Sequence, residues 1–157
     1  MTACFFSGHR KVYDGDRVFS TLEKEIERHI TEFGVRAFYV GNHGDFDFMV
    51  QRALVKAKAQ HPDVLAQVAL AYHPAIRPIE CPKGLDGTYF PENQEAAPPR
   101  YAIVKLNREM VKSVQYLVAY VYAVTDGSYN LLRYAEGRAK RGLLHITNIA
   151  EDIKTPL

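Results

Sequence analysis

Apolar and polar positions follow two different periods along this chain. Mostly apolar runs cover residues 3–6, 36–40, 67–72, 116–124 and 143–146 and are typical of strands. The run over residues 116–124 is rich in β-branched and aromatic residues, as expected for a strand that is buried on both faces. Between the runs, apolar residues recur every three or four positions, which is the period of one helical face. The first such set is Val18, Leu22, Ile26, Ile30 and Phe33. The pattern therefore predicts four helices that alternate with five strands.

Turn residues mark where these helices begin and end. Gly34 follows the first helix, and His61-Pro62 ends a second helix predicted over residues 45–60. A third helix follows Pro98-Pro99, and Gly142 ends a fourth. Strands that alternate with helices form a parallel sheet with right-handed crossovers. We therefore predict one α/β domain over residues 1–157, a Rossmann-like three-layer fold with strand order 3-2-1-4-5.

Residues 73–99 interrupt the alternation. This segment contains six of the eight prolines of the chain and two adjacent aromatic residues, Tyr89 and Phe90. A connection of this length in a compact domain is usually functional or disordered. We predict a lid over the ligand site, with Tyr89 or Phe90 clamped over a base.

Gly-containing loops follow three of the predicted strands. Ser7-Gly8-His9-Arg10 follows the first strand, Gly41-Asn42-His43-Gly44-Asp45 the second, and Asp126-Gly127-Ser128 comes before the fourth helix. In the predicted strand order the first and third of these loops face one crevice, with the second beside them. Backbone N–H groups at such turns favour an anion. The loops therefore predict a site for a phosphate or a nucleotide.

Charge and composition narrow the choice of partner. The net charge of +2 argues against bulk electrostatic binding to nucleic acid. Residues 100–142 contain eight basic and three acidic residues, an excess that suits a small anionic ligand or a solvated helix surface about equally. Cys4 and Cys81 are expected to be free thiols, and no Cys/His spacing predicts a metal site. With no apolar leader and no run long enough to span a bilayer, we expect a cytoplasmic protein without a bound metal or cofactor.

The loops and several later motifs resemble those of a known superfamily, called SLOG. It groups the lonely-guy phosphoribohydrolases, the DNA-processing protein A fold and the YpsA-like proteins, and the likeness is best to small uncharacterised bacterial YpsA-like members. The matching pieces lie at residues 4–10, 38–44, 46–47, 98–103, 107–110, 126–128 and 134–135. The resemblance implies a Rossmann-like nucleotide-binding fold, usually dimeric, without a settled activity. It also implies that Arg108 stands where an arginine of the lonely-guy enzymes contacts the nucleotide.

The chain departs from this family pattern at two places. Relatives commonly carry a Gly-Gly pair before the fourth helix, and here Asp126 takes the first position. A carboxylate there would repel a phosphate, unless it contacts a ribose hydroxyl or a base. The Gly41 loop is also one residue longer than in many relatives. Two roles are therefore open for Asp47: it contacts the ligand or, like Asp45, it caps the helix.

We name a set of candidate ligand-binding residues from these loops and from the resemblance. For most of them a structural role is the alternative: a local loop contact for His9, a surface ion pair for Arg10, an exposed helix position for Arg108 and a helix cap for Ser128. The candidates are Ser7, Gly8, His9, Arg10, Gly41, Asn42, Gly44, Asp47, Arg100, Arg108, Asp126, Gly127 and Ser128.

Two functions of different classes fit these observations. One is a module that binds a nucleotide or a nucleotide derivative without chemistry, and the other is a phosphoribohydrolase that acts on nucleoside monophosphates. The hydrolase needs an acidic pair, but the alignment places Leu132 and Arg133 there, with Glu136 one helical turn beyond Leu132. We therefore favour the binding module. A third and weaker hypothesis is a DNA-processing role, against which the near-neutral net charge and the single small domain count.

Overall fold

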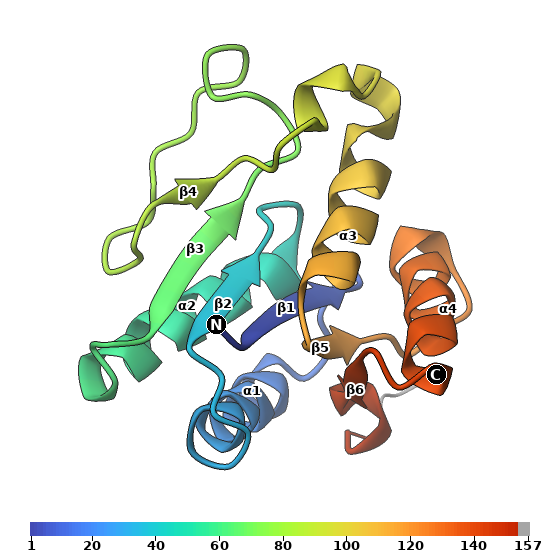
Figure 1. The fold of residues 1–157 in the computed structure, drawn as a ribbon. Coiled ribbons are helices and arrows are strands. Elements are labelled where there is room, and N and C mark those ends of the chain that lie inside the picture. The colour runs from blue at the N-terminus through green and yellow to red at the C-terminus, as the bar shows by residue number, and fades with distance from the viewer. Residues whose placement is uncertain (154–157) are drawn as a thin grey trace.

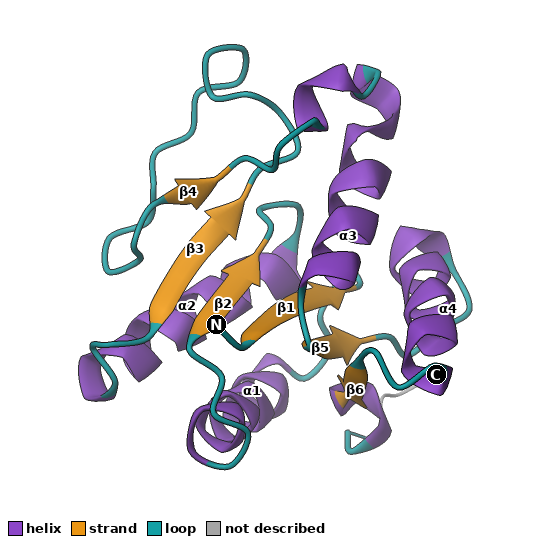
Figure 2. Cartoon of the chain, in the orientation of Figure 1, coloured by secondary structure: helices purple, strands orange, loops and turns teal. Residues whose placement is uncertain are grey.

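The chain forms a six-stranded, all-parallel sheet with helices on both faces, as a computed structural model describes for residues 1–153 (Figures 1 and 2). The sheet order is β4-β3-β2-β1-β5-β6. The strands are β1 (Ala3–Gly8), β2 (Ala37–Val40), β3 (Leu65–Ala69), β4 (Thr88–Tyr89), β5 (Tyr116–Tyr120) and β6 (His145–Asn148). The helices are α1 (Gly15–Thr31), α2 (Asp45–Gln60), α3 (Ala102–Ser113) and α4 (Asp126–Lys140), with short 3-10 helices at Gln94–Ala96, Pro99–Tyr101 and Ile149–Glu151.

Each face of the sheet is covered by its own pair of helices. Helices α1 and α2 lie behind the sheet in Figure 1, and α3 and α4 lie in front of it. Strand β1 sends alternate side chains to the two layers: Cys4 and Phe6 join the core beneath α1 and α2, and Phe5 joins the core beneath α3 and α4. This two-sided burial explains why β1 appears in the sequence as an uninterrupted apolar run.

The predicted α/β class and three-layer architecture are confirmed. The five predicted strands occur in the predicted order relative to one another, but a sixth strand, β4, pairs with the outer edge of β3. The prediction was wrong in omitting β4, because two residues within a proline-rich segment carry no recognisable period. It was also wrong in extending the strand from Tyr116 to residue 124, since β5 ends at Tyr120 and the chain then turns toward α4.

The sheet reverses its direction of winding at β1. Strand β1 pairs with β2 on one side and with β5 on the other, all in parallel. The connections that follow β1 and β5 therefore leave to opposite faces of the sheet and open a crevice between them. The loops that follow β1, β2 and β5 all lie at this edge.

Candidate functional site

A cavity of about 310 Å³ lies at the carboxyl ends of β1, β2 and β5. Its wall is built from the loops after these strands, the first turn of α4 and one side of α3. This is the crevice that parallel α/β sheets form where the strand order reverses. Nine predicted site residues line it: Ser7, Gly8, His9, Arg10, Gly41, Asp47, Asp126, Gly127 and Ser128.

Four predicted site residues lie outside the cavity. The guanidinium of exposed Arg100 lies 4.8 Å from the ring centroid of its neighbour Tyr101, and that of exposed Arg108 lies 4.9 Å from the Tyr134 ring. Asn42 and Gly44 are also absent from the wall. The structure therefore does not bring these four residues together with the other nine at the cavity. Arg108 lies on α3, Arg100 lies in the 3-10 helix Pro99–Tyr101, and Asn42 and Gly44 lie in the turn before α2.

Gly44 allows the turn before α2 to lie close to the loop after β1. Its φ is +143°, and a Cβ at this position would lie 2.8 Å from the Cα of Arg10. The N–H of Asp45 donates to the Arg10 carbonyl at 2.8 Å, which ties the loop after β1 to the start of α2. A side chain at residue 44 would push these segments apart.

Gly8 serves close packing rather than a sharp turn. A Cβ there would lie 2.5 Å from the Phe46 ring and 2.9 Å from the Cβ of Tyr120. Both side chains are fully buried, and their rings stack with a centroid distance of 5.4 Å. Gly8 therefore lets α2 sit against the end of β1, and any role in ligand binding has to come from its backbone.

His9 is buried and has both ring nitrogens in hydrogen bonds. Its Nε2 accepts from the N–H of Ala123 at 3.2 Å, so Nδ1 carries the proton and donates to Asp126 at 2.9 Å. His9 therefore makes the local loop contacts that were the alternative to ligand binding: its imidazole joins the loop after β1 to Ala123 and to Asp126 at the start of α4. It shapes the cavity wall without a free polar atom for a ligand.

Asp126 occupies the left-handed region that glycine normally fills. Its φ is +64°, which explains why a glycine suits this position and why an aspartate is tolerated there. One carboxylate oxygen accepts from His9, and the other accepts from the N–H of Ser128 at 2.8 Å. The Ser128 hydroxyl in turn donates to the Gly8 carbonyl at 2.7 Å, so Ser128 is bound to β1 rather than free.

Asp47 is the ionisable group that the fold perturbs most at this site. Burial raises the pKa of Asp47 from 3.8 to about 6, although the His43 N–H and the charge of Arg10 act in the opposite direction. Its Oδ2 accepts from the His43 N–H at 3.0 Å, and a Cβ on Gly41 would lie 2.9 Å from the same oxygen. Asp47 thus accepts a hydrogen bond from the turn before α2, in part as a capping residue would, and its carboxyl group borders the cavity.

His43 was not among the predicted contacts, although it lies inside a predicted loop. Burial lowers the pKa of His43, and the positive charges of Arg10 and Arg77 lower it further. Its Nε2 is buried and has no hydrogen-bond partner among residues 1–153. Other lining residues that the sequence did not suggest are Phe5, Phe6, Lys11, Ile103, Asn107 and Tyr122.

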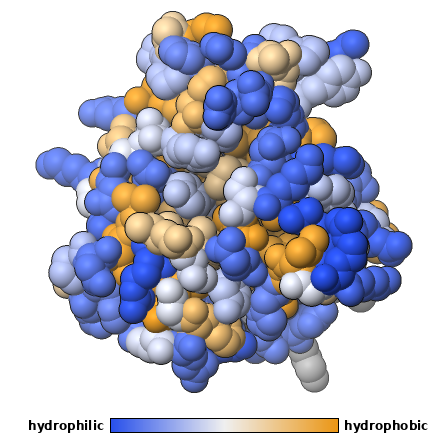
Figure 3. All heavy atoms as spheres, in the orientation of Figure 1, coloured by the Kyte–Doolittle hydropathy of each residue, from blue (hydrophilic) through white to orange (hydrophobic). Residues whose placement is uncertain are grey.

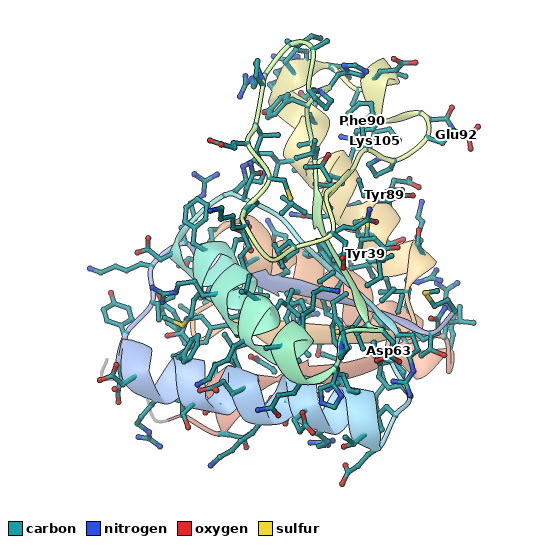
Figure 4. The ribbon with its side chains drawn as sticks, turned by 90° about the vertical axis from the view of Figure 1, so that its left-hand side faces the viewer. Tyr39, Asp63, Tyr89, Phe90, Glu92 and Lys105 are labelled. Carbon is teal, nitrogen blue, oxygen red and sulfur yellow. The ribbon has the colours of Figure 1, made fainter. Side chains whose placement is uncertain are left out.

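The predicted aromatic clamp does not reach the cavity. The Tyr89 ring packs on Tyr39 at a centroid distance of 5.4 Å, and the Phe90 ring packs on His73 at 5.2 Å (Figure 4). Neither residue lines the cavity, because β4 holds this part of the 73–99 segment against β3. Tyr122 is an aromatic residue that does line the cavity, and its ring packs edge-on against His9 at a centroid distance of 4.3 Å.

The helix positions tied to hydrolase chemistry also lie away from the cavity. Glu136 is exposed and lies 3.9 Å from the Arg133 guanidinium, one turn away on the same face of α4. Leu132 packs against the core beneath α3 and α4. None of the three is in the cavity wall.

Residues 1–153 contain no group of three or more His, Cys, Asp or Glu side chains placed to hold a metal ion. No helix in the described part of the chain is long and apolar enough to cross a membrane. A scan against protein-family models found no match for the chain, and a search of curated proteins found none. The family resemblance therefore stays a prediction from the motifs alone.

Proposed function

We propose that this protein binds a nucleotide or a nucleotide derivative in the cavity at the ends of β1, β2 and β5. The observation that carries the proposal is that one cavity combines cationic side chains with an available carboxylate. A nucleotide needs both kinds of group, because its phosphate pairs with cations and its sugar hydroxyls donate to carboxylates. A simple anion would need only the first kind.

The cationic side is formed by Arg10 and Lys11. Both side chains are exposed at the cavity, and neither is in an ion pair within the described residues. A guanidinium can donate two parallel hydrogen bonds to one phosphate, which makes Arg10 the stronger candidate.

The carboxylate side is formed mainly by Asp47. Its Oδ2 already accepts from His43, whereas its Oδ1 accepts no hydrogen bond in the part of the chain that the structure describes. That oxygen is available to a ligand hydroxyl. Both oxygens of Asp126 are in use, so Asp126 contributes charge and shape more than a free acceptor. Buried carboxyl groups of raised pKa are typical of functional sites.

The size of the cavity fits a small ligand. Its volume of about 310 Å³ is at the lower end of the range for ligand pockets. Arg10, Lys11, Asp126 and Gly127 line the cavity and are exposed, so the cavity is open to solvent where these residues lie. A mononucleotide-sized molecule with its charged end outward satisfies both features.

Thermal unfolding with a panel of nucleoside monophosphates tests this proposal. A ligand at a hundred times its Kd adds about 2.7 kcal/mol to the free energy of unfolding, which raises Tm measurably. Arg10→Ala should weaken the stabilisation. Arg133→Ala removes a guanidinium that lies on α4 outside the cavity, so it serves as the matched control and should leave the stabilisation intact. A panel in which no nucleotide raises Tm, or one in which both variants behave alike, would contradict the proposal.

A phosphoribohydrolase-like activity is the alternative, and one observation favours it. A carboxyl group whose pKa is about 6 is suited to proton transfer near neutral pH, and Asp47 has one. Against it, the aligned acidic pair is replaced by Leu132 and Arg133, and Glu136 lies away from the cavity. We therefore keep binding without hydrolysis as the proposed function.

We further propose, from the resemblance and the composition, that the protein is a cytoplasmic homodimer. A dimer would have twice the chain mass of 17.8 kDa. Light scattering coupled to size exclusion measures this mass directly, and a mass of one chain at micromolar concentration would reject the dimer.

A further inference from the structure

The cavity has a charged side toward α2 and an uncharged side toward α3, two helices that cover opposite faces of the sheet. Asp47 lies in α2, and the Arg10 carbonyl accepts from the first N–H of that helix at 2.8 Å. From α3, only Ile103 and Asn107 reach the cavity wall, and neither carries a charge. The two sides therefore suit different parts of one ligand.

Ser7 places a hydroxyl group on the uncharged side. Side chains alternate along β1, and Phe5 packs in the core beneath α3 and α4, so Ser7 faces the same layer. The residue is buried and lines the cavity, and its hydroxyl has no hydrogen-bond partner within residues 1–153. The hydroxyl is therefore available to a ligand, unlike that of Ser128, which donates to the Gly8 carbonyl.

Asn107 places an amide group on the same side. It comes one helical turn after Ile103, so the two side chains share one face of α3. Asn107 is half-buried in the cavity wall, and its amide makes no hydrogen bond in the part of the chain that the structure describes. The fold therefore does not use this amide, and a ligand in the cavity meets both its donor and its acceptor.

The neighbouring residue, Arg108, points to a different surface. Successive residues of a helix are about 100° apart, and the exposed Arg108 guanidinium lies 4.9 Å from the ring centroid of Tyr134 on α4. Figure 3 shows polar residues over much of the outer face on the side of α3 and α4, with apolar groups in small patches between them. An exposed arginine is ordinary on this surface. Asn107 is therefore the polar side chain that α3 brings to the cavity.

The uncharged side matches a nucleobase in its chemistry. A base has apolar faces, for which Ile103 offers contact, and a polar edge on which donors and acceptors lie side by side. An amide donates through its nitrogen and accepts through its oxygen, which is the pairing that such an edge needs. A phosphate offers acceptors and negative charge, and these suit Arg10 on the other side.

We propose that Asn107 reads the base of the bound nucleotide through a pair of hydrogen bonds, with the Ser7 hydroxyl as a further contact. This inference rests on the proposed nucleotide binding and adds an orientation to it: the base lies toward α3, and the phosphate lies toward Arg10. Asn107 is then the residue that determines base specificity, because a base that leaves the amide unpaired binds less tightly.

Isothermal titration with AMP, GMP, CMP and UMP tests the inference, with ribose 5-phosphate as a probe that lacks the base. Asn107→Leu keeps a side chain of similar size without polar atoms. It should weaken the tightest-binding nucleotide at least about tenfold and leave the affinity for ribose 5-phosphate unchanged. Arg108→Ala changes the adjacent residue of the same helix and should keep the wild-type affinity for both. Thermal unfolding checks that each variant is folded.

Asn107→Asp provides a second variant with a directional result. A carboxylate accepts hydrogen bonds and donates none, and among the four bases only guanine has two neighbouring donors, N1–H and the 2-amino group. Asn107→Asp should therefore shift the ratio of GMP affinity to AMP affinity toward GMP by at least about tenfold.

Each outcome bears on a different claim. Unchanged nucleotide affinity in Asn107→Leu, no shift toward GMP in Asn107→Asp, or an equal loss in Arg108→Ala would overturn the inference and leave the proposed function standing. Wild-type binding of ribose 5-phosphate as tight as that of every nucleotide would show that the base contributes nothing and would overturn both. No binding of any of the four nucleotides would overturn the proposed function and the inference with it.

Discussion

Replacing Asp47 with asparagine should stabilise the unliganded protein at neutral pH. The pKa of Asp47 is about 6 in the folded chain against 3.8 ordinarily, chiefly because burial disfavours the charged form. The folded state therefore holds the proton more tightly than the unfolded state. The contribution of Asp47 to stability is greatest below pH 3.8 and is lost as pH rises through 6.

The size of this loss follows from the shift. Roughly two pKa units correspond to at most about 3 kcal/mol at pH 7.5, because one unit is worth about 1.36 kcal/mol. Asparagine retains an oxygen that can accept the His43 N–H, now 3.0 Å from Asp47 Oδ2, and it carries no charge. Asp47→Asn should therefore gain stability over the wild type as pH rises, from almost none near pH 4 to as much as about 3 kcal/mol at pH 7.5.

Urea unfolding at pH 4.5, 6 and 7.5 measures this difference. Asp45→Asn is the matched control, because Asp45 is exposed in the same first turn of α2. A carboxylate there favours the helix, so the control should lose about 0.3–1 kcal/mol. If Asp47→Asn were less stable than the wild type at pH 7.5, or if its advantage did not change with pH, the reasoning about the buried carboxyl group would be refuted.

Three further predictions concern packing, pH and chemistry. Gly8→Ala should lower the free energy of unfolding by about 1–3 kcal/mol in urea, because its Cβ would lie 2.5 Å from the Phe46 ring; an unchanged midpoint would argue against this contact. Burial lowers the pKa of His29, so stability should fall as pH drops below 6.5, and His29→Phe should reduce that slope; equal slopes in the two proteins would contradict it. Incubation with AMP should release no free base or ribose 5-phosphate on chromatography, and robust turnover that disappears in Glu136→Gln would promote the hydrolase alternative.

Much of the architecture could be predicted because local patterns determine it. The predicted helix over residues 45–60 coincides with α2, since Gly44 and His61-Pro62 bound its amphipathic period. The order of the five predicted strands followed from right-handed crossovers. Strand β4 could not be predicted. Thr88 and Tyr89 pair with β3 through their backbones, and a segment of two residues is too short to show the alternating pattern of a strand.

The site was predictable only as far as the strand ends. Loops after apolar runs indicated where a crevice would form, and nine of the thirteen predicted residues line it. The partners within it were not predictable, because His9 meets Asp126 across 117 positions of the chain. Tyr122 was not predicted as a site residue, because in the sequence it continues the apolar run that begins with β5.

The most direct test of the central claim is the affinity of the intact chain for nucleotides, measured by isothermal titration with matched arginine variants. We predict saturable binding of at least one nucleotide to the wild type, at least about tenfold weaker binding to Arg10→Ala, and wild-type affinity in Arg133→Ala. Arg10 lines the cavity, and Arg133 lies outside it. Nucleotide binding that is equally strong in Arg10→Ala, or no binding by the wild type at millimolar concentration, would contradict the claim that this cavity is a nucleotide site.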